Sequence, residues 1–275
     1  MNNTVVRTFS GIAFLVVVLA GLLINKYLFA VLLIAMMGTM LYEFYRMTMG
    51  TRYRLMQGLT IGFGVLAFLS LFLVCAFGLD RNLLAVNILL LIALMVGTLL
   101  VKDKKDFRSF AFLFMGLLYI AVPLTLSNLV VFDGNGGFSG LLIVAFFCII
   151  WSSDVGAYCF GMLFGKNGRK LFPSISPKKS WAGFWGGLVM SLVAAYILYL
   201  TGMLAFPFVH CLVLAALMNV AGVYGDLFES QWKRDAGIKD SGNLIPGHGG
   251  ALDRFDSTLF AMPAGVAYLL LMHLI

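Results

Sequence analysis

The sequence predicts an all-α protein, a polytopic transmembrane helical bundle of about nine spans with a cytoplasmic N-terminus. Hydrophobic residues make up 61% of the chain and charged residues only 11%, whereas ordinary soluble domains contain about a quarter charged residues. Apolar runs of about 20 residues recur along the chain, the length that a membrane-spanning helix needs. Such runs must be helical in lipid because every backbone polar group has to be paired. A soluble globular protein is therefore excluded.

Nine apolar runs have the length of a span. In chain order they are Val5–Ile24, Tyr27–Tyr45, Leu59–Phe77, Leu83–Val101, Phe110–Val131, Phe138–Leu163, Trp181–Leu200, Phe206–Tyr224 and Ser257–Ile275. With this count, seventeen of the nineteen lysines and arginines fall on one side of the membrane, and cytoplasmic loops carry such an excess. The net charge of +7 is then mainly a signal of topology, so we expect no nucleic-acid partner.

The two halves of the chain differ in polarity. Residues 1–135 are interpreted as a scaffold of membrane helices, and we expect their Glu43 to form a surface ion pair with Arg46, three residues further along the same helix. Residues 136–275 are interpreted as the catalytic region, with cytoplasmic loops at 164–181 and 225–257.

Asp154 lies inside the sixth apolar run. A carboxylate at such a position has to face the bundle interior or a wet cavity. It belongs either to a functional site or to a hydrogen bond with a neighbouring helix, and the sequence leaves both readings open.

Six of the twelve acidic residues lie in the single stretch 225–257. Charge at a membrane boundary is costly and is kept mainly where it binds an ion or a polar substrate. If Phe206 to about Trp232 forms one helix, Asp226, Ser230 and Lys233 share one face of it. That face suits either the coupling-ion site of a transporter or the metal and phosphate site of an enzyme.

The glycine-rich segment PGHGG favours the enzyme. Its glycines, Gly249 and Gly250 among them, let the backbone approach a phosphate closely. Asp253 and Asp256 follow at a spacing that places both on one face of a helix start, and with Asp226 they offer three oxygen donors. Carboxylate oxygens completed by water and substrate phosphates suit Mg²⁺, which supports nucleotidyl or phosphoryl transfer.

Several other polar residues could contact phosphate. His248 stands between glycines and is interpreted as a phosphate contact or a proton handler. Arg254 could pair with the flanking carboxylates or contact substrate phosphate. Lys178 and Lys179, which follow Pro177, are either ordinary flanking charges or ligands of a polyphosphate.

These polar residues follow a spacing that resembles the signature of the phosphatidate cytidylyltransferase (CDP-diacylglycerol synthase) family. The residues that carry the resemblance are Ser230-x-x-Lys233-Arg234, Lys239-Asp240 and Pro246-x-His248-Gly249-Gly250-x-x-Asp253-Arg254-x-Asp256, together with Gly225–Ser230 and Ser176–Trp181 upstream. Ala182 departs from the family pattern, which more usually has Glu after the lysine-bearing loop.

The resemblance implies a multi-pass enzyme of the inner (cytoplasmic) membrane with its active site facing the cytoplasm. Such an enzyme converts CTP and phosphatidate from the bilayer to CDP-diacylglycerol and pyrophosphate in phospholipid biosynthesis, with Mg²⁺. The catalytic residues that we expect are Asp226, Ser230, Lys233, His248, Asp253 and Asp256, with the metal on Asp226, Asp253 and Asp256. The expected nucleotide contacts are Lys178, Lys179, Arg234, Gly249, Gly250 and Arg254.

A second cation and a homodimer are compatible with this reading. Two alternatives remain open: a CTP-dependent lipid kinase, which would release CDP, and an ion-coupled transporter, which would turn over no nucleotide.

Overall fold

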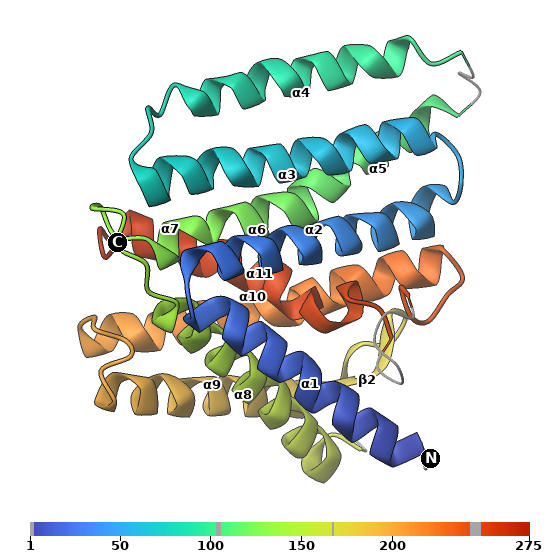
Figure 1. The fold of residues 1–275 in the computed structure, drawn as a ribbon. Coiled ribbons are helices and arrows are strands. Elements are labelled where there is room, and N and C mark those ends of the chain that lie inside the picture. The colour runs from blue at the N-terminus through green and yellow to red at the C-terminus, as the bar shows by residue number, and fades with distance from the viewer. Residues whose placement is uncertain (1–2, 103–105, 167, 243–248) are drawn as a thin grey trace. The chain divides into compact units, whose positions relative to one another are not determined.

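A computed structural model (Figure 1) describes residues 3–102, 106–166, 168–242 and 249–275. Its regular structure is almost entirely helical, which confirms the predicted all-α class. The chain forms two compact units, and each is built from two separate stretches of sequence. Met1–Ser139 and Asp240–Arg254 form the first unit, and Gly140–Lys239 and Phe255–Ile275 form the second.

The first unit is a stack of helices. Its elements are α1 (Asn3–Leu23), α2 (Lys26–Met49), α3 (Arg54–Phe77), α4 (Leu83–Leu99), η1 (Phe107–Ser109), α5 (Phe110–Gly116), the π-helical η2 (Leu117–Ala121), α6 (Val122–Leu126) and α7 (Asn128–Val131). Asn25 caps α2 by accepting from the N–H groups of Tyr27 and Leu28. In Figure 1, α2, α3 and α4 run side by side, and consecutive members pack against one another.

The core of the first unit is aromatic. Phe29, Phe44, Tyr45 and Phe68 have no exposed surface. Tyr45 also donates its hydroxyl to the backbone oxygen of Leu113 at 2.8 Å, which satisfies a polar atom that burial would otherwise leave unpaired. This bond connects α2 to α5, so the second helix of the chain is held by both packing and hydrogen bonding.

The second unit contains the remaining helices and one hairpin. Its elements are α8 (Leu141–Phe164), β1 (Lys170–Phe172), β2 (Ser176–Ser180), α9 (Trp181–Leu200), α10 (Phe208–Asp235) and α11 (Leu252–Leu271), the last of which begins in the first unit. The two strands are antiparallel and lie within the predicted loop 164–181, where no strand was expected. Inside the unit, Ser153 of α8 donates to the side-chain oxygen of Asn219 on α10 at 2.6 Å.

Seven helical stretches of the described chain are long and apolar enough to cross a membrane. They are Lys26–Met49, Arg54–Phe77, Leu83–Leu100, Phe107–Val131, Leu141–Phe164, Trp181–Leu200 and Phe208–Asp235, and they match the second to eighth predicted spans. Helices α1 and α11 occupy the positions of the first and ninth predicted spans but are not among the seven. The protein is an integral membrane protein, while the count of nine and the cytoplasmic N-terminus stay predictions.

Candidate active site

One face of α10 holds the first group of predicted site residues. The helix runs from Phe208 to Asp235, which confirms the continuous helix expected from the sequence. Ser230 donates its hydroxyl to Asp226 Oδ1 at 3.2 Å, as their spacing of four residues predicts. Lys179 Nζ lies 2.6 Å from Asp226 Oδ2. Both oxygens of the Asp226 carboxylate are therefore engaged by predicted site residues.

The two lysines of β2 differ in their surroundings. Side chains of successive strand residues point to opposite faces, so Lys179 contacts Asp226 while Lys178 is exposed. From the sequence, the same two roles were possible for both lysines. In the structure, their successive positions on the strand give them different surroundings. Of the pair, Lys179 is the one that the structure brings to the carboxylate group.

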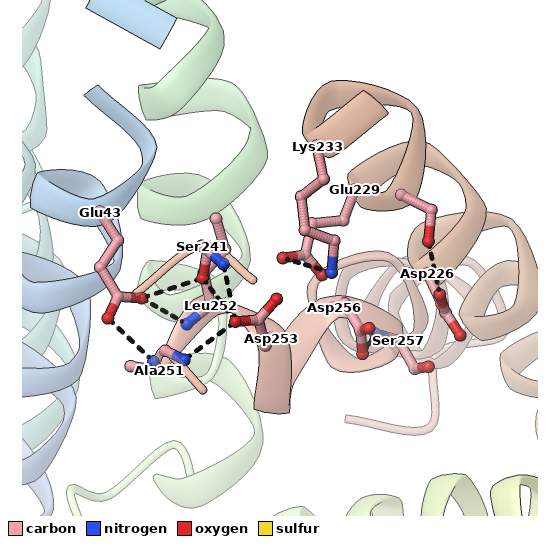
Figure 2. Close-up of polar contacts among 12 residues, drawn as sticks. Glu43, Asp226, Glu229, Lys233, Ser241, Ala251, Leu252, Asp253, Asp256 and Ser257 are labelled. Atoms are coloured by element: carbon pink, nitrogen blue, oxygen red, sulfur yellow. Dashed lines mark hydrogen bonds and ion pairs between the residues drawn. The ribbon is translucent and has the colours of Figure 1, made fainter. Parts of the chain in front are cut away.

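Lys233 forms a buried ion pair with Glu229. Its Nζ lies 3.3 Å from Glu229 Oε1, and the exposed fractions of the two side chains are 12% for Lys233 and 0% for Glu229. A carboxylate that is fully shielded from solvent needs a positively charged partner close to it. Figure 2 shows the pair on the same helix as Asp226. Glu229, which was not among the predicted site residues, is therefore the partner that holds the Lys233 ammonium group in place.

Asp256 joins this group from α11. A Cβ on Gly225 would lie 2.7 Å from the backbone oxygen of Asp256, so α10 and α11 approach this closely only because residue 225 has no side chain. Burial and then the negative charge of Asp226 raise the pKa of Asp256 above its ordinary value. The two carboxylates thus lie close enough for their negative charges to repel each other.

Asp154 of α8 belongs to the same group. It interacts electrostatically with Asp226 and Lys179, and with Asp256. Of the two readings that the sequence left open, this placement favours the functional site. The second unit therefore brings together three carboxylates that interact electrostatically, from α8, α10 and α11, with Lys179 acting on Asp154 and Asp226 and Lys233 acting on Asp256.

Asp253 lies in the first unit, in the first turn of α11. Its Oδ2 accepts from the N–H of Ser241 at 2.8 Å, from the hydroxyl of Ser241 at 3.0 Å and from the N–H of Gly250 at 2.9 Å. Gly249, which precedes this contact, has a φ of 84°, a conformation that side chains strongly disfavour. One oxygen of Asp253 is thus occupied in holding the glycine segment, a role that the sequence did not predict.

The position of Glu43 contradicts the predicted surface ion pair with Arg46. Glu43 forms no such pair, because its side chain is buried, with 6% exposure, and it accepts from the N–H groups of Ala251 and Leu252 (Figure 2). The interpretation was wrong because local helix spacing favoured Arg46, whereas the true partners lie more than two hundred residues away. The available signal was an acidic residue inside a predicted span, because no other predicted span in residues 1–135 contains Asp or Glu.

The remaining predicted site residues lie in different surroundings. Arg234 donates through Nε to the backbone oxygen of Ile175 at 3.5 Å, and this long hydrogen bond connects the end of α10 to the hairpin. Arg254 is exposed. His248 lies outside the described residues. Within the described ranges, no three carboxylate, imidazole or thiolate groups form an evident metal centre, so the predicted metal trio stays a prediction.

Comparisons with known proteins agree on one family. A family model described as the cytidylyltransferase family matches residues 5–272. The chain is 37% identical to a phosphatidate cytidylyltransferase of Bacillus subtilis (strain 168) over 94% of each chain. It is 36% identical to a protein of the same name from Staphylococcus saprophyticus, over 66% of each chain. A third, from Rickettsia bellii, is 36% identical over 63% of this chain and 76% of its own.

Proposed function

This chain belongs to the cytidylyltransferase family, and from that premise we propose that it converts CTP and phosphatidate to CDP-diacylglycerol and pyrophosphate. The group of Asp154, Asp226, Asp256 and Lys179 in the second unit carries the proposal. It combines carboxylates, which bind metal, with an ammonium group, which binds phosphate. The positive-inside charge pattern supports an active site on the cytoplasmic side, where CTP is found.

In the proposed reaction, a phosphate oxygen of phosphatidate attacks the α-phosphorus of CTP. A new phosphorus–oxygen bond forms, the bond between the α- and β-phosphates breaks, and pyrophosphate leaves with the bonding electrons. The attacking phosphate is already ionised, so no strong general base is needed. Both reactants are anionic, and catalysis therefore depends on positioning and on neutralising charge.

Lys179 is the residue best placed to neutralise that charge. Its ammonium group lies 2.6 Å from Asp226, and its side chain is 25% exposed, so it can be reached from outside the protein. Lys233 supplies a second ammonium group, oriented by Glu229. Ser230, which donates to Asp226, holds the carboxylate in one orientation.

We propose that carboxylates of this group bind a divalent cation when substrate is present. Asp226 and Asp256 lie close enough to repel each other, and burial raises the pKa of Asp256, so a cation between such groups relieves an unfavourable interaction. Within the second unit, Asp226 and Asp256 would hold Mg²⁺. When bound, the metal supplies neutralisation of the charge that develops on the transferring phosphate.

The test is a product assay with purified protein, CTP, phosphatidate and Mg²⁺. We expect pyrophosphate and CDP-diacylglycerol, and we expect Asp226→Asn to lower pyrophosphate release by about a hundredfold or more, the scale at which charge-stabilising groups act. Asp235→Asn, which removes an exposed carboxylate from the end of the same helix, is the matched control and should keep its activity. Release of CDP and a phosphorylated lipid would instead identify a lipid kinase, and the absence of nucleotide turnover would refute the proposal.

A further inference from the structure

The start of α11 has no capping side chain of its own. The first four N–H groups of a helix have no partner within it and need an outside acceptor. Ser, Thr, Asp or Asn usually supplies one from the residue before the helix. Here that place is taken by Ala251, preceded by Gly250, and neither residue has a side-chain acceptor.

Glu43 of α2 supplies the missing acceptors. Its Oε1 accepts from the N–H of Ala251 at 3.1 Å, and its Oε2 accepts from the N–H of Leu252 at 2.9 Å. The hydroxyl of Ser241 lies 3.4 Å from the same Oε2. Figure 2 shows the Glu43 carboxylate directed at these groups. A negative charge at a helix N-terminus is also favoured by the helix dipole.

The surrounding backbone is shaped to admit this carboxylate. A Cβ on Gly250 would lie 2.6 Å from Glu43 Oε2, and a Cβ on Gly242 would collide with Oε1. The backbone therefore depends on glycine at both position 242 and position 250 to approach Glu43. Burying a charge is costly without such hydrogen bonds, so the carboxylate and the backbone around it specify one arrangement.

The same backbone carries a predicted site residue. Asp253 accepts from Gly250 and Ser241, so two carboxylates, Glu43 and Asp253, hold the N–H groups of residues 250–252. Misplacing a reacting group by about 1 Å costs on the order of a hundredfold in rate. Whatever fixes this turn therefore fixes the direction in which Asp253 is presented.

We infer that Glu43 is a positioning residue for cytidylyl transfer, which acts by holding the backbone of Ala251 and Leu252 and thereby the turn that carries Asp253. The inference rests on the proposed function. It assigns a role in the reaction to a helix of the predicted scaffold. A cap within the segment itself would have required a larger side chain at position 250 or 251, next to the glycines that the substrate phosphates are expected to approach.

The first test is Glu43→Gln, which preserves the size of the side chain and one acceptor oxygen but replaces the other oxygen with an amide that cannot accept. We expect kcat for pyrophosphate release, per mole of folded protein, to fall about ten- to a hundredfold. Hydrogen exchange at the amides of Ala251 and Leu252 should become faster, because one of them loses its acceptor.

The matched control is Gln57→Met. Gln57 is also a buried polar residue of the first unit, with 7% exposure, but its amide donates to the backbone oxygens of Gly50 and Arg52 and not to the glycine segment. It should lower the melting temperature without lowering kcat per folded molecule. A second variant, Gly242→Ala, displaces the same carboxylate, so its effect on kcat should not add to that of Glu43→Gln.

Unchanged kcat in Glu43→Gln, with a lower melting temperature like that of the control, would show that Glu43 only stabilises the fold and would overturn the inference. Additive effects of the two variants would also overturn it. A parent protein that releases no pyrophosphate would instead refute the proposed function, and the inference with it.

Discussion

The buried ion pair of Glu229 and Lys233 leads to a quantitative prediction. Lys233→Met removes an ammonium group 3.3 Å from Glu229 Oε1 and leaves a carboxylate whose side chain has 0% exposure. Breaking a buried pair by removing one partner costs about 3–5 kcal/mol, because the remaining charge stays desolvated. Each kcal/mol lowers the melting temperature of a domain of 150–250 residues by roughly 2–4 °C. We therefore expect a loss of roughly 6–20 °C in detergent-solubilised protein.

A second variant separates stability from catalysis. Glu229→Met combined with Lys233→Met removes both charges, and a buried pair replaced by apolar side chains of similar volume is often close to neutral in stability. We expect the double variant to regain most of the lost melting temperature and none of the activity, because the ammonium group is absent from both. Thermal unfolding and pyrophosphate release are the two measurements.

Lys166→Met is the matched control, because Lys166 is an exposed lysine of the same unit. Such surface changes usually stay within about 0.5 kcal/mol. A Lys233→Met protein as stable as this control would refute the argument from burial. So would a double variant that melts below the single one.

Three further predictions concern packing and charge. Gly225→Ala should destabilise the protein by about 1–3 kcal/mol, seen as a lower melting temperature, because its Cβ would lie 2.7 Å from the α11 backbone. Lys179→Met should lower kcat strongly while Lys178→Met changes it little, since only the first lysine contacts the carboxylate group; equal losses would contradict this. Tyr45→Phe should cost about 0.5–1.5 kcal/mol of stability with kcat unchanged, since its lost hydrogen bond lies in the core of the first unit.

Much of the helical fold could be predicted because apolar length is a local property. The span predicted at Trp181–Leu200 coincides with α9, where Ser180 caps the helix by accepting from the N–H of Gly183. The hairpin could not be predicted in the same way, since strands as short as Lys170–Phe172 contain too few residues to show an alternating pattern. Helix α11 begins at Leu252, in agreement with the helix start predicted around Asp253 and Asp256, whereas the apolar span was predicted only from Ser257 because the first turn contains Asp253 and Arg254.

The site was predictable where its contacts are local. Ser230 and Asp226 meet because they are four residues apart on one helix. The partners of Glu43 and Lys179 depend on tertiary structure, since 208 residues separate Glu43 from Ala251, and Lys179 reaches Asp226 from a different element. Glu43 shows the resulting error most clearly, because the nearest cation in sequence was taken for its partner.

The interleaving of the two units has a consequence for how the chain is made. Neither unit is complete until the last part of the sequence has been synthesised, because Asp240–Arg254 belongs to the first unit. Glu43 precedes its donor Leu252 by 209 residues, which at about 5–20 residues per second corresponds to roughly 10–40 s of translation. Throughout that interval the carboxylate has none of the hydrogen bonds that later hold it. The first unit therefore gains these hydrogen bonds only after its amino-terminal helices have been synthesised, and residues from the carboxyl-terminal part of the chain complete it.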